Sequence, residues 1–496
     1  MPFLSEKFHL SRRSLLRYGA GSALGVGLAG SGVPLFRGAE AAVRSAPLAA
    51  PRLTATGANI PGDPTQRTLV VVQLSGGNDG LNTVVPFTDP HYATLRPTIK
   101  QDPTTLISLT KDLALNQNLR PLFNYWNSGQ LAVIEGVEYP QPNYSHFRGT
   151  EIWMTGDDQR TGSLGWIGHS LDHLASHPAL VAVSLGVTVP QALVGQQPID
   201  IALGGSLGSF AYKPAGGQVD PAMISALYDY MASNSGSTSN PYKKLVVDSH
   251  EAAQQAISGV AAIAKAGYTP AVTYPRSSLA GGLQTVAQMI HGGVGARVLF
   301  VSTSGFDTHV TQKNAHDGLL ATFAQAVDAF FQDLAAHGLA DNVTLMTFSE
   351  FGRRPGENAS QGTDHGSASV MFVMGPSITG GMFGNAPSLD PANLPGGNLI
   401  VQQDFRQVYA ALLQDWLGFS AADVLPYGPY QPTPLFAPRP NIAPTAHPTA
   451  PVATSAAGVA ATVAAQPTSN ATNHPAPTAI TATTPTATPL PQPARH

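Results

Sequence analysis

Charged side chains are scarce in this chain. They make up only 11% of its 496 residues, whereas an average soluble protein has roughly 25%. The 26 basic and 30 acidic residues nearly balance, which leaves a net charge of -4 at pH 7. A protein that binds nucleic acid or an anionic membrane through charge needs a dense basic surface, and this composition does not offer one. We therefore expect no nucleic-acid partner.

Cysteine is absent. This excludes disulfides, thiolate metal sites, a cysteine nucleophile and lipid attachment through an N-terminal cysteine. A chain of this length can bury a core that is large enough to fold without disulfides.

The N-terminal segment has the pattern of an export signal. Arg12 and Arg13 precede a mildly apolar stretch rich in Gly and Ala, and AEA at 39–41 offers a small-residue cleavage site. The pattern resembles a twin-arginine (Tat) signal peptide over residues 1–41, followed by a linker over 42–66. The alternative is a membrane anchor, but glycines and Pro34 make a poor spanning helix. We expect passage through the Tat translocase to the periplasm, cell envelope or exterior, with no stable membrane span.

The C-terminal segment, residues 438–496, consists largely of Ala, Thr, Pro and Ser. Such a segment cannot bury enough apolar surface to offset the entropy of ordering it. We expect a disordered tail.

Residues 67–437 have the pattern of an α/β domain. Apolar runs that suit buried strands occur at 68–75, 130–137, 179–186, 296–303, 342–348 and 369–375. Amphipathic helical patterns lie at 278–293, 316–338 and 404–418, the last with Gly418 as its stop. The alternation predicts a three-layer sandwich, in which helices cover both faces of a largely parallel sheet. Residues 187–270 are richer in Gly and Ser, and we expect a cap or insertion there.

Polar residues follow four of these runs, where a parallel sheet binds its ligands. They are Asn78 and Asp79; Ser145, His146 and Arg148; Asp307 and His309; and Glu350 and Arg353. In an extended segment, Asp307 and His309 point to the same side and could hold one metal ion. The alternative is an aspartate that orients a neighbouring histidine. Asn78 and Asp79 also read as a turn, and Ser145 is in no G-x-S-x-G elbow.

Six motifs together resemble a known family. They are SGGNDGLNTVVP, SHFRGTEIWMTG, GFDTH, FSEFGRRPGEN, GTDHG and DFRQVYAALLQDWLG. In this order they are similar to a Tat-exported bacterial family, the domain of unknown function fifteen-oh-one. That family is related to the alkaline phosphatase and sulfatase superfamily. The resemblance implies an alkaline-phosphatase-like fold and a site that hydrolyses anionic esters with the help of metal ions.

The resemblance also implies roles for individual residues. Ser145 corresponds to the nucleophile, and Arg148 and Arg353 are candidates to hold the ester's oxygens. The metal ligands implied are Asp79, Asp307, His309, Glu350 and His365. One or two divalent ions are implied, with zinc, manganese and calcium as candidates.

Two departures from the superfamily pattern bear on activity. Phe351 stands where a metal-binding histidine is usual, and Asp307 and His309 are closer in sequence than in the phosphatases. We expect an exported hydrolase of phosphate or sulfate esters, which acts on a small-molecule or polymer-borne anionic ester. The alternative is a non-catalytic envelope or surface binding protein with a degenerate metal site.

Overall fold

The computed structural model describes residues 66–437 except 176, 177, 179, 187, 197–199, 204–206 and 208–254. The chain divides into two compact units, Met1–Pro438 and Arg439–His496, and all described residues belong to the first. The expected signal peptide, nearly all of the linker, most of the expected insertion at 187–270 and the expected tail lie outside the described residues.

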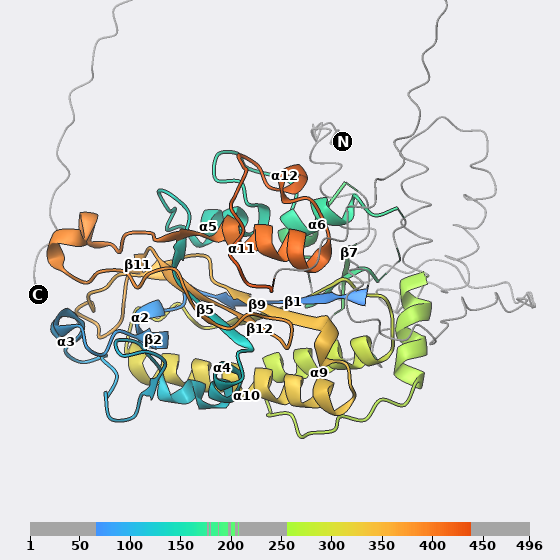
Figure 1. Cartoon of the computed structure of the whole chain (residues 1–496), viewed down its shortest axis with the longest axis horizontal. Helices are drawn as coiled ribbons and strands as arrows, with labels where there is room; N and C mark the ends of the chain where they lie inside the picture. The colour runs from blue at the N-terminus through green and yellow to red at the C-terminus, as the bar shows by residue number, and fades with distance from the viewer. Residues whose placement is uncertain are drawn as a thin grey trace, which may run out of the picture. The chain divides into compact units, whose positions relative to one another are not determined.

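A nine-stranded sheet forms the centre of the body (Figure 1). Its strands follow the order β13-β5-β12-β9-β1-β8-β6-β7, and β14 also pairs with β5. Within the described part of this sheet, every strand pair is parallel except the two that β12 forms with β5 and β9. The strands are β1 (Thr68–Ser75), β5 (Leu131–Glu138), β6 (Ala182–Leu185), β7 (Asp200–Ala202), β8 (Val298–Ser304), β9 (Val343–Phe348), β12 (Ser369–Met374), β13 (Gly381–Phe383) and β14 (Gln403–Asp404). The predicted, largely parallel α/β sheet is confirmed.

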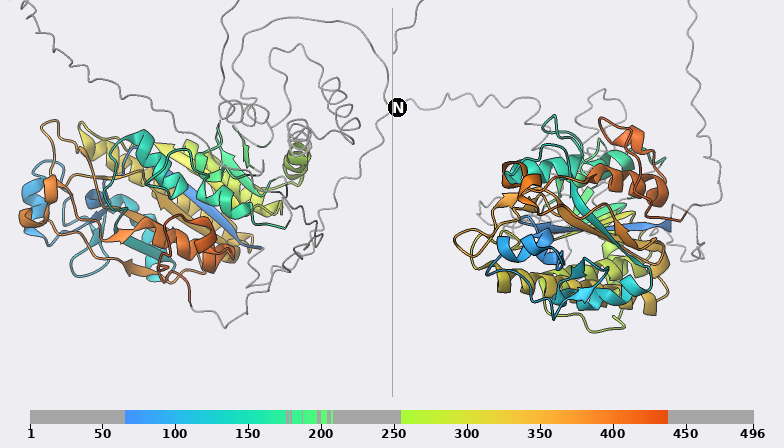
Figure 2. Two further views of the ribbon diagram at one scale, coloured as in Figure 1. Left: turned by 90° about the horizontal axis from the view of Figure 1, so that it is seen from above. Right: turned by 60° about the vertical axis from the view of Figure 1, so that its left-hand side comes forward.

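Helices lie on both faces of the sheet (Figures 1 and 2). One face carries α5 (His146–Thr155), α6 (Trp166–Leu171), α11 (Phe405–Ala411) and α12 (Ala421–Val424). The other carries α4 (Phe123–Asn127), α9 (Ser278–His291) and α10 (Gln312–Ala336). A π-helix, Leu412–Leu417, continues α11 and ends at Gly418, whose φ of 77° is the left-handed conformation typical of a helix stop.

The alternation of side chains along β1 explains these two helical layers. Val70, Val72 and Leu74 belong to the core shared with α9 and α10. Leu69 and Val71 belong to the second core, which includes side chains of α5, α6 and α11. Because successive side chains of a strand point to opposite faces, a continuous apolar run produces a sheet that is buried on both sides.

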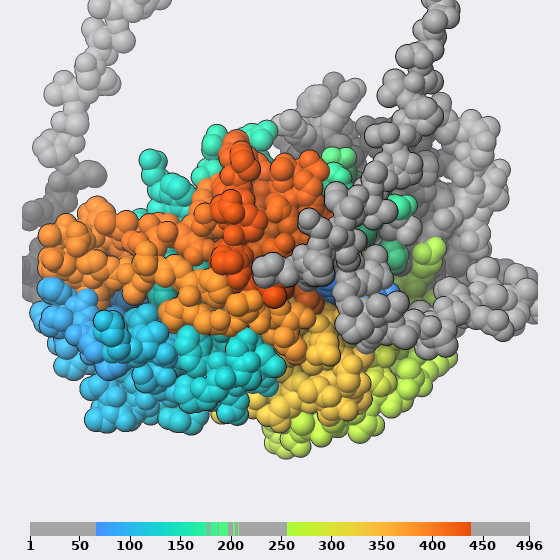
Figure 3. All heavy atoms as spheres, in the orientation of Figure 1, coloured from blue at the N-terminus to red at the C-terminus, as the bar shows by residue number. Residues whose placement is uncertain are grey.

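Shorter elements surround one end of the sheet. They are α2 (Gly80–Thr83), α3 (Pro90–Leu95), the three-stranded sheet β2 (Val84–Val85), β4 (Ala114–Leu115) and β3 (Ile107–Ser108), and the pair β10 (Gly352–Arg353) and β11 (His365–Gly366). Segments far apart in sequence meet on the surface: the blue-to-cyan early part of the body borders the orange late part (Figure 3). Within the described ranges, no helix is both long and apolar enough to cross a bilayer.

The strand directions gather several loops at one edge. β1, β5, β8 and β9 run the same way, so the loops that follow them leave from the same end of the sheet. Because β12 runs the opposite way, its beginning lies at that same end, where Ser369 pairs with Val137. The segment before β12, which contains His365, is therefore brought to the edge where the ligands of such sheets bind.

Candidate metal centre

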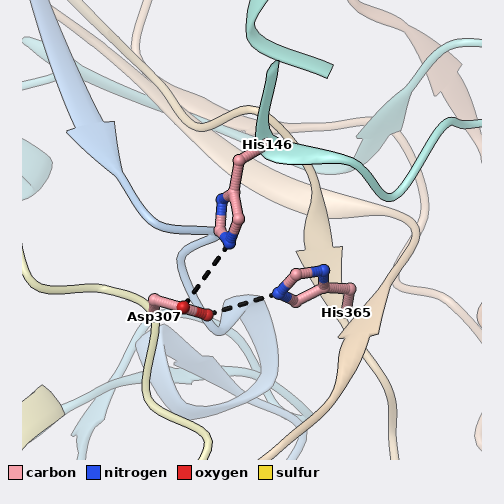
Figure 4. Close-up of side chains that lie close together, drawn as sticks. All are labelled: His146, Asp307 and His365. Carbon is pink, nitrogen blue, oxygen red and sulfur yellow. Dashed lines mark hydrogen bonds and ion pairs between the residues drawn. The ribbon is translucent and has the colours of Figure 1, made fainter. Parts of the chain in front are cut away.

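Three side chains converge at this edge: His146, Asp307 and His365 (Figure 4). One ligand atom from each lies within 4.8 Å of the others. His146 Nε2 is 3.5 Å from Asp307 Oδ2, and His365 Nε2 is 3.3 Å from Asp307 Oδ1. Within the described ranges this is the one group of three or more His or acidic residues close enough to share an ion.

The three residues come from three segments that lie far apart in the chain. His146 is the first residue of α5, eight positions after the end of β5. Asp307 follows β8, and His365 opens the short strand β11. The centre therefore depends on the order of the strands in the sheet and on no single sequence motif.

Glu350 fixes the tautomer of His146. Its Oε1 lies 2.9 Å from His146 Nδ1, and its carboxylate also accepts the backbone N–H of Gly76 at 2.9 and 3.1 Å. A carboxylate can only accept, so His146 carries a proton on Nδ1 when its ring is neutral. Nε2 then presents a lone pair toward Asp307, which is the usual arrangement of a metal-binding histidine.

The backbone carbonyl of Tyr144 fixes the tautomer of His365. The ring's Nδ1 donates to Tyr144 O at 2.8 Å, which leaves Nε2 unprotonated in the neutral ring. Burial lowers the pKa of His365, and the charge of Arg353 adds to this, although the bond to Tyr144 opposes it. The ring is therefore neutral near pH 7, as a metal ligand must be.

Asp307 is held in its ionised form. Burial alone would raise the pKa of its carboxyl, but the hydrogen bond and charge of Arg353 outweigh burial and lower the pKa. Arg353 Nη2 lies 2.7 Å from Asp307 Oδ1. The centre thus contains one carboxylate and two imidazoles.

His309 lies beside the centre as a fourth candidate ligand. Its Nε2 is 3.0 Å from Asp307 Oδ1 and 2.9 Å from His365 Nε2. Its Nδ1 lies 3.5 Å from Asp364 Oδ1. Because Nε2 of the neutral His365 ring is unprotonated, a proton on His309 Nε2 would be donated to it, and a cation bound between the two nitrogens would take the place of that proton. Two imidazoles bound to one tetrahedral ion at ~2.0 Å would be separated by roughly 3.3 Å.

Phe351 supports two of the rings. It is fully buried, and its ring centroid lies 4.9 Å from that of His146 and 4.3 Å from that of His365. Phe351 therefore packs against two candidate ligands, and its own side chain has no atom that could bind a metal ion.

Arg353 was predicted to hold an ester's oxygens, but in the structure its guanidinium forms hydrogen bonds to other groups of the protein. Its side chain is fully buried. Its guanidinium donates to Asp307 and to the backbone carbonyls of Gly76, Gly77, Phe306 and Thr363. These bonds fasten the loops after β1 and β8 to the segment that carries His365. The structure places Arg353 beneath the centre, with its donors occupied.

Asp79, predicted as a metal ligand, lies in a separate buried network. Its Oδ2 forms an ion pair with Arg96 Nη1 at 2.6 Å and accepts Gln312, and its Oδ1 accepts the N–H of Asn82. Although burial would raise the pKa of Asp79, Arg96 and the other partners lower it. Gln312 Oε1 in turn accepts the hydroxyl of Thr363, so the network supports the loop of His365 from below.

The remaining predicted residues take other places. Glu350, predicted as a ligand, lies behind His146. Arg148 Nη1 forms an ion pair with Glu151 at 3.0 Å, and its Nη2 donates to Asp157 O. Ser145 precedes α5 as its N-cap; its side chain is exposed and makes no capping bond.

The donor set fits a borderline transition-metal ion. Two or three imidazole nitrogens with one carboxylate oxygen suit zinc or manganese, whereas calcium prefers an all-oxygen shell. Calcium, one of the three ions predicted, is therefore not favoured by these residues. The single group of ligands points to one ion.

A cavity of about 450 Å³ adjoins the centre. It extends from His146 and Asp307 along the first turns of α5 and past the ends of β1 and β8. This volume is in the range of small-molecule sites.

Sequence reasoning gave His146 no role in metal binding. The available signal was its position: it follows a strand end and occupies the first turn of a helix next to Ser145. No spacing rule links it to Asp307, which is 161 positions away in the chain.

Residues 238–394 match the family described as "Protein of unknown function (DUF1501)", the family that the six motifs resemble. No curated protein has a matching sequence.

Solved structures with similarity to this chain include Ps i-CgsB at 10% identity and a TM-score of 0.31, over 65% of this chain and 69% of that one. The lipoteichoic acid synthase LtaP from Listeria monocytogenes has 9% identity and a TM-score of 0.24, over 73% and 75%. An alkaline phosphatase from the Antarctic bacterium TAB5 has 12% identity and a TM-score of 0.26, over 64% and 95%. Similarity this distant assigns no reaction, and the chemistry rests on the residues of this chain.

Proposed function

We propose that this chain, which matches the DUF1501 family over residues 238–394, is an exported metal-dependent hydrolase of phosphate or sulfate esters. The observation that carries the proposal is the convergence of His146, Asp307 and His365. In both histidines, Nδ1 bonds to an acceptor and Nε2 is directed toward Asp307. This arrangement has the form of a metal site beside a cavity that can hold a substrate.

The centre lies where an anionic ester would be stabilised. A divalent ion, when bound, neutralises developing charge on the ester oxygens. His146 is the first residue of α5, so the positive end of that helix's dipole adds to the attraction for an anion. The adjoining cavity has room for the group that carries the ester.

Ser145 is the proposed nucleophile. Its exposed side chain makes no capping hydrogen bond, and it precedes His146 directly in the chain. The Ser145 oxygen would attack phosphorus or sulfur and form a serine ester, while the bond from that atom to the alcohol oxygen breaks. The proton lost by the serine hydroxyl is balanced by the proton that the leaving alcohol takes up. Water would then cleave the serine ester, which releases phosphate or sulfate and restores Ser145.

Export through the Tat pathway is part of the proposal and rests on the sequence around Arg12 and Arg13. Replacing both with lysine should leave the protein in the cytoplasm. Fractionation of cells that express the two forms tests this, and equal export of both would reject the Tat route.

Hydrolysis of aryl phosphates and aryl sulfates, with and without added zinc or manganese, tests the activity. Ser145→Ala and His365→Ala should lower kcat at least about 100-fold. Ser420→Ala is the matched control, because Ser420 is also an exposed N-cap with no side-chain bond. Equal turnover by wild type and Ser145→Ala would remove the serine from the mechanism.

The second candidate is a non-catalytic binding protein that retains one metal ion. Two observations favour it: Phe351 occupies the position of an expected ligand, and Arg353 is bonded to Asp307 Oδ1. A chain that binds one ion per molecule and turns over none of the esters would fit this function and contradict the hydrolase.

A further inference from the structure

Phe147 is exposed at the cavity beside the centre. Its exposed fraction is 92%, the highest of any large apolar side chain among the described residues. It follows His146 directly on the first turn of α5 and lines the cavity. An aromatic ring that is exposed to water lacks the stabilisation that burial of its apolar surface would give. Next to a candidate metal ligand, such a ring offers an incoming molecule an apolar surface to contact.

The charges around the cavity restrict what can enter it. No lysine or arginine is among the described residues that line it, whereas Glu151, Asp307 and Glu350 are. Arg148, the nearest basic residue on α5, is paired with Glu151, and Arg353 is buried with its donors occupied. Apart from an ion at the centre, the walls would therefore repel a second anionic group on the same ligand.

The other lining groups are neutral. Thr150, Gln191 and Ser304 provide hydroxyl and amide groups, and Gly76 and Gly305 expose backbone. These groups can bond to uncharged polar atoms and cannot neutralise further phosphates or sulfates.

We propose that the cavity selects esters that carry one anionic group on an uncharged aromatic moiety, which stacks on Phe147, and that it rejects polyanions. This rests on the proposed function. It narrows the substrate to aryl monoesters and disfavours nucleoside triphosphates and sulfated oligosaccharides.

Binding tests the proposal independently of turnover. With zinc-loaded protein, calorimetry should show that phenylphosphonate binds and that a nucleoside triphosphate binds more weakly. Phe147→Ala should weaken phenylphosphonate binding roughly 3- to 10-fold, as expected for the loss of one aromatic contact, and Phe147→Tyr should retain it. Ile400→Ala is the matched control, because Ile400 is an exposed apolar residue outside this cavity.

Adding a cation tests the charge argument. Thr150→Lys should raise triphosphate affinity at least about 3-fold, and by a larger factor than it raises phenylphosphonate affinity. The proposed selectivity would be overturned if the wild type bound the triphosphate more tightly than phenylphosphonate. It would also be overturned if Phe147→Ala left phenylphosphonate affinity unchanged. If phenylphosphonate binds as predicted but no ester is hydrolysed, the selectivity stands and the hydrolase proposal fails.

Discussion

Glu350 Oε1 accepts a hydrogen bond from Nδ1 of His146 over 2.9 Å, and the same carboxylate accepts the backbone N–H of Gly76. The bond joins the loop after β9 to the first turn of α5. It gives the carboxylate a role behind the candidate ligand, where it orients the ring and raises its basicity.

Glu350→Gln should weaken metal binding 10- to 100-fold, as is typical for loss of such a supporting carboxylate. The amide still accepts from His146, so the fold is retained while the negative charge is lost. Competition with a chromophoric zinc chelator measures the affinity. Glu357→Gln is the control in the segment between β9 and β11, because Glu357 bonds to Thr98 and Ile99 instead. Equal affinity in wild type and Glu350→Gln would contradict the assignment.

Asp79→Asn should destabilise the protein and leave its metal content unchanged. Asp79 and Arg96 form a fully buried ion pair, and removal of one charge leaves the other unpaired at a cost of roughly 3–5 kcal/mol. Urea unfolding measures the loss, with Asp89→Asn, a partly exposed helix cap, as control. Loss of the metal without loss of stability would make Asp79 a ligand after all.

Arg353→Lys should lower the free energy of unfolding by roughly 2–4 kcal/mol, because a lysine cannot reproduce the fork of bonds to buried carbonyls. At temperatures where the variant is folded, its KM for an aryl ester should stay within about 3-fold of the wild-type value. The reason is that the guanidinium bonds to groups of the protein and not to the substrate. Arg354→Lys is the control, because that side chain is exposed. A large rise in KM with unchanged stability would restore Arg353 as a substrate ligand.

Glu135 predicts a pH dependence of stability. Burial raises the pKa of this carboxyl to about 8, and its Oε1 has no hydrogen-bond partner. The folded state thus holds a proton that the unfolded chain releases above its ordinary pKa of 4.5. The contribution to stability is complete below pH 4.5 and is lost as pH rises toward 8, by at most about 1.4 kcal/mol per pH unit.

Glu135→Gln should therefore be more stable than wild type at pH 8 and nearly equal to it at pH 5. Urea unfolding at the two pH values measures the difference, with Glu357→Gln as control. Parallel pH profiles for wild type and Glu135→Gln would show that Glu135 is ionised in the folded protein.

Much of the fold could be predicted from local sequence. The apolar runs at 68–75, 130–137, 179–186, 296–303, 342–348 and 369–375 became β1, β5, β6, β8, β9 and β12. Their burial on both faces follows from their lack of alternation. The strands β7, β13 and β14 have two or three residues each and carry too little pattern to be recognised.

The candidate site could be predicted only in part. Asp307 follows a strand at the edge where ligands bind, and its residue type and position were enough to indicate it. His365 was indicated only by the family resemblance. His146 reaches Asp307 only through the packing of α5 on the sheet, which no local spacing encodes.

The roles of the buried charges were equally hidden in the sequence. Asp79 and Arg353 have the residue types of a ligand and an anion clamp, yet each is engaged by other buried groups. Asp79 is paired with Arg96, 17 positions later in the chain. Arg353 donates to backbone carbonyls of three separate loops. These are long-range contacts that depend on the complete fold.

His146, Asp307 and His365 are proposed to bind one divalent ion. Elemental analysis by mass spectrometry, after zinc loading and dialysis, tests this proposal most directly. Wild type and His91→Ala, a partly exposed histidine outside the centre, should hold about one ion per chain, and folded His146→Ala and His365→Ala should hold less than about a tenth. Wild type without bound metal, or equal metal in all four proteins, would contradict the account.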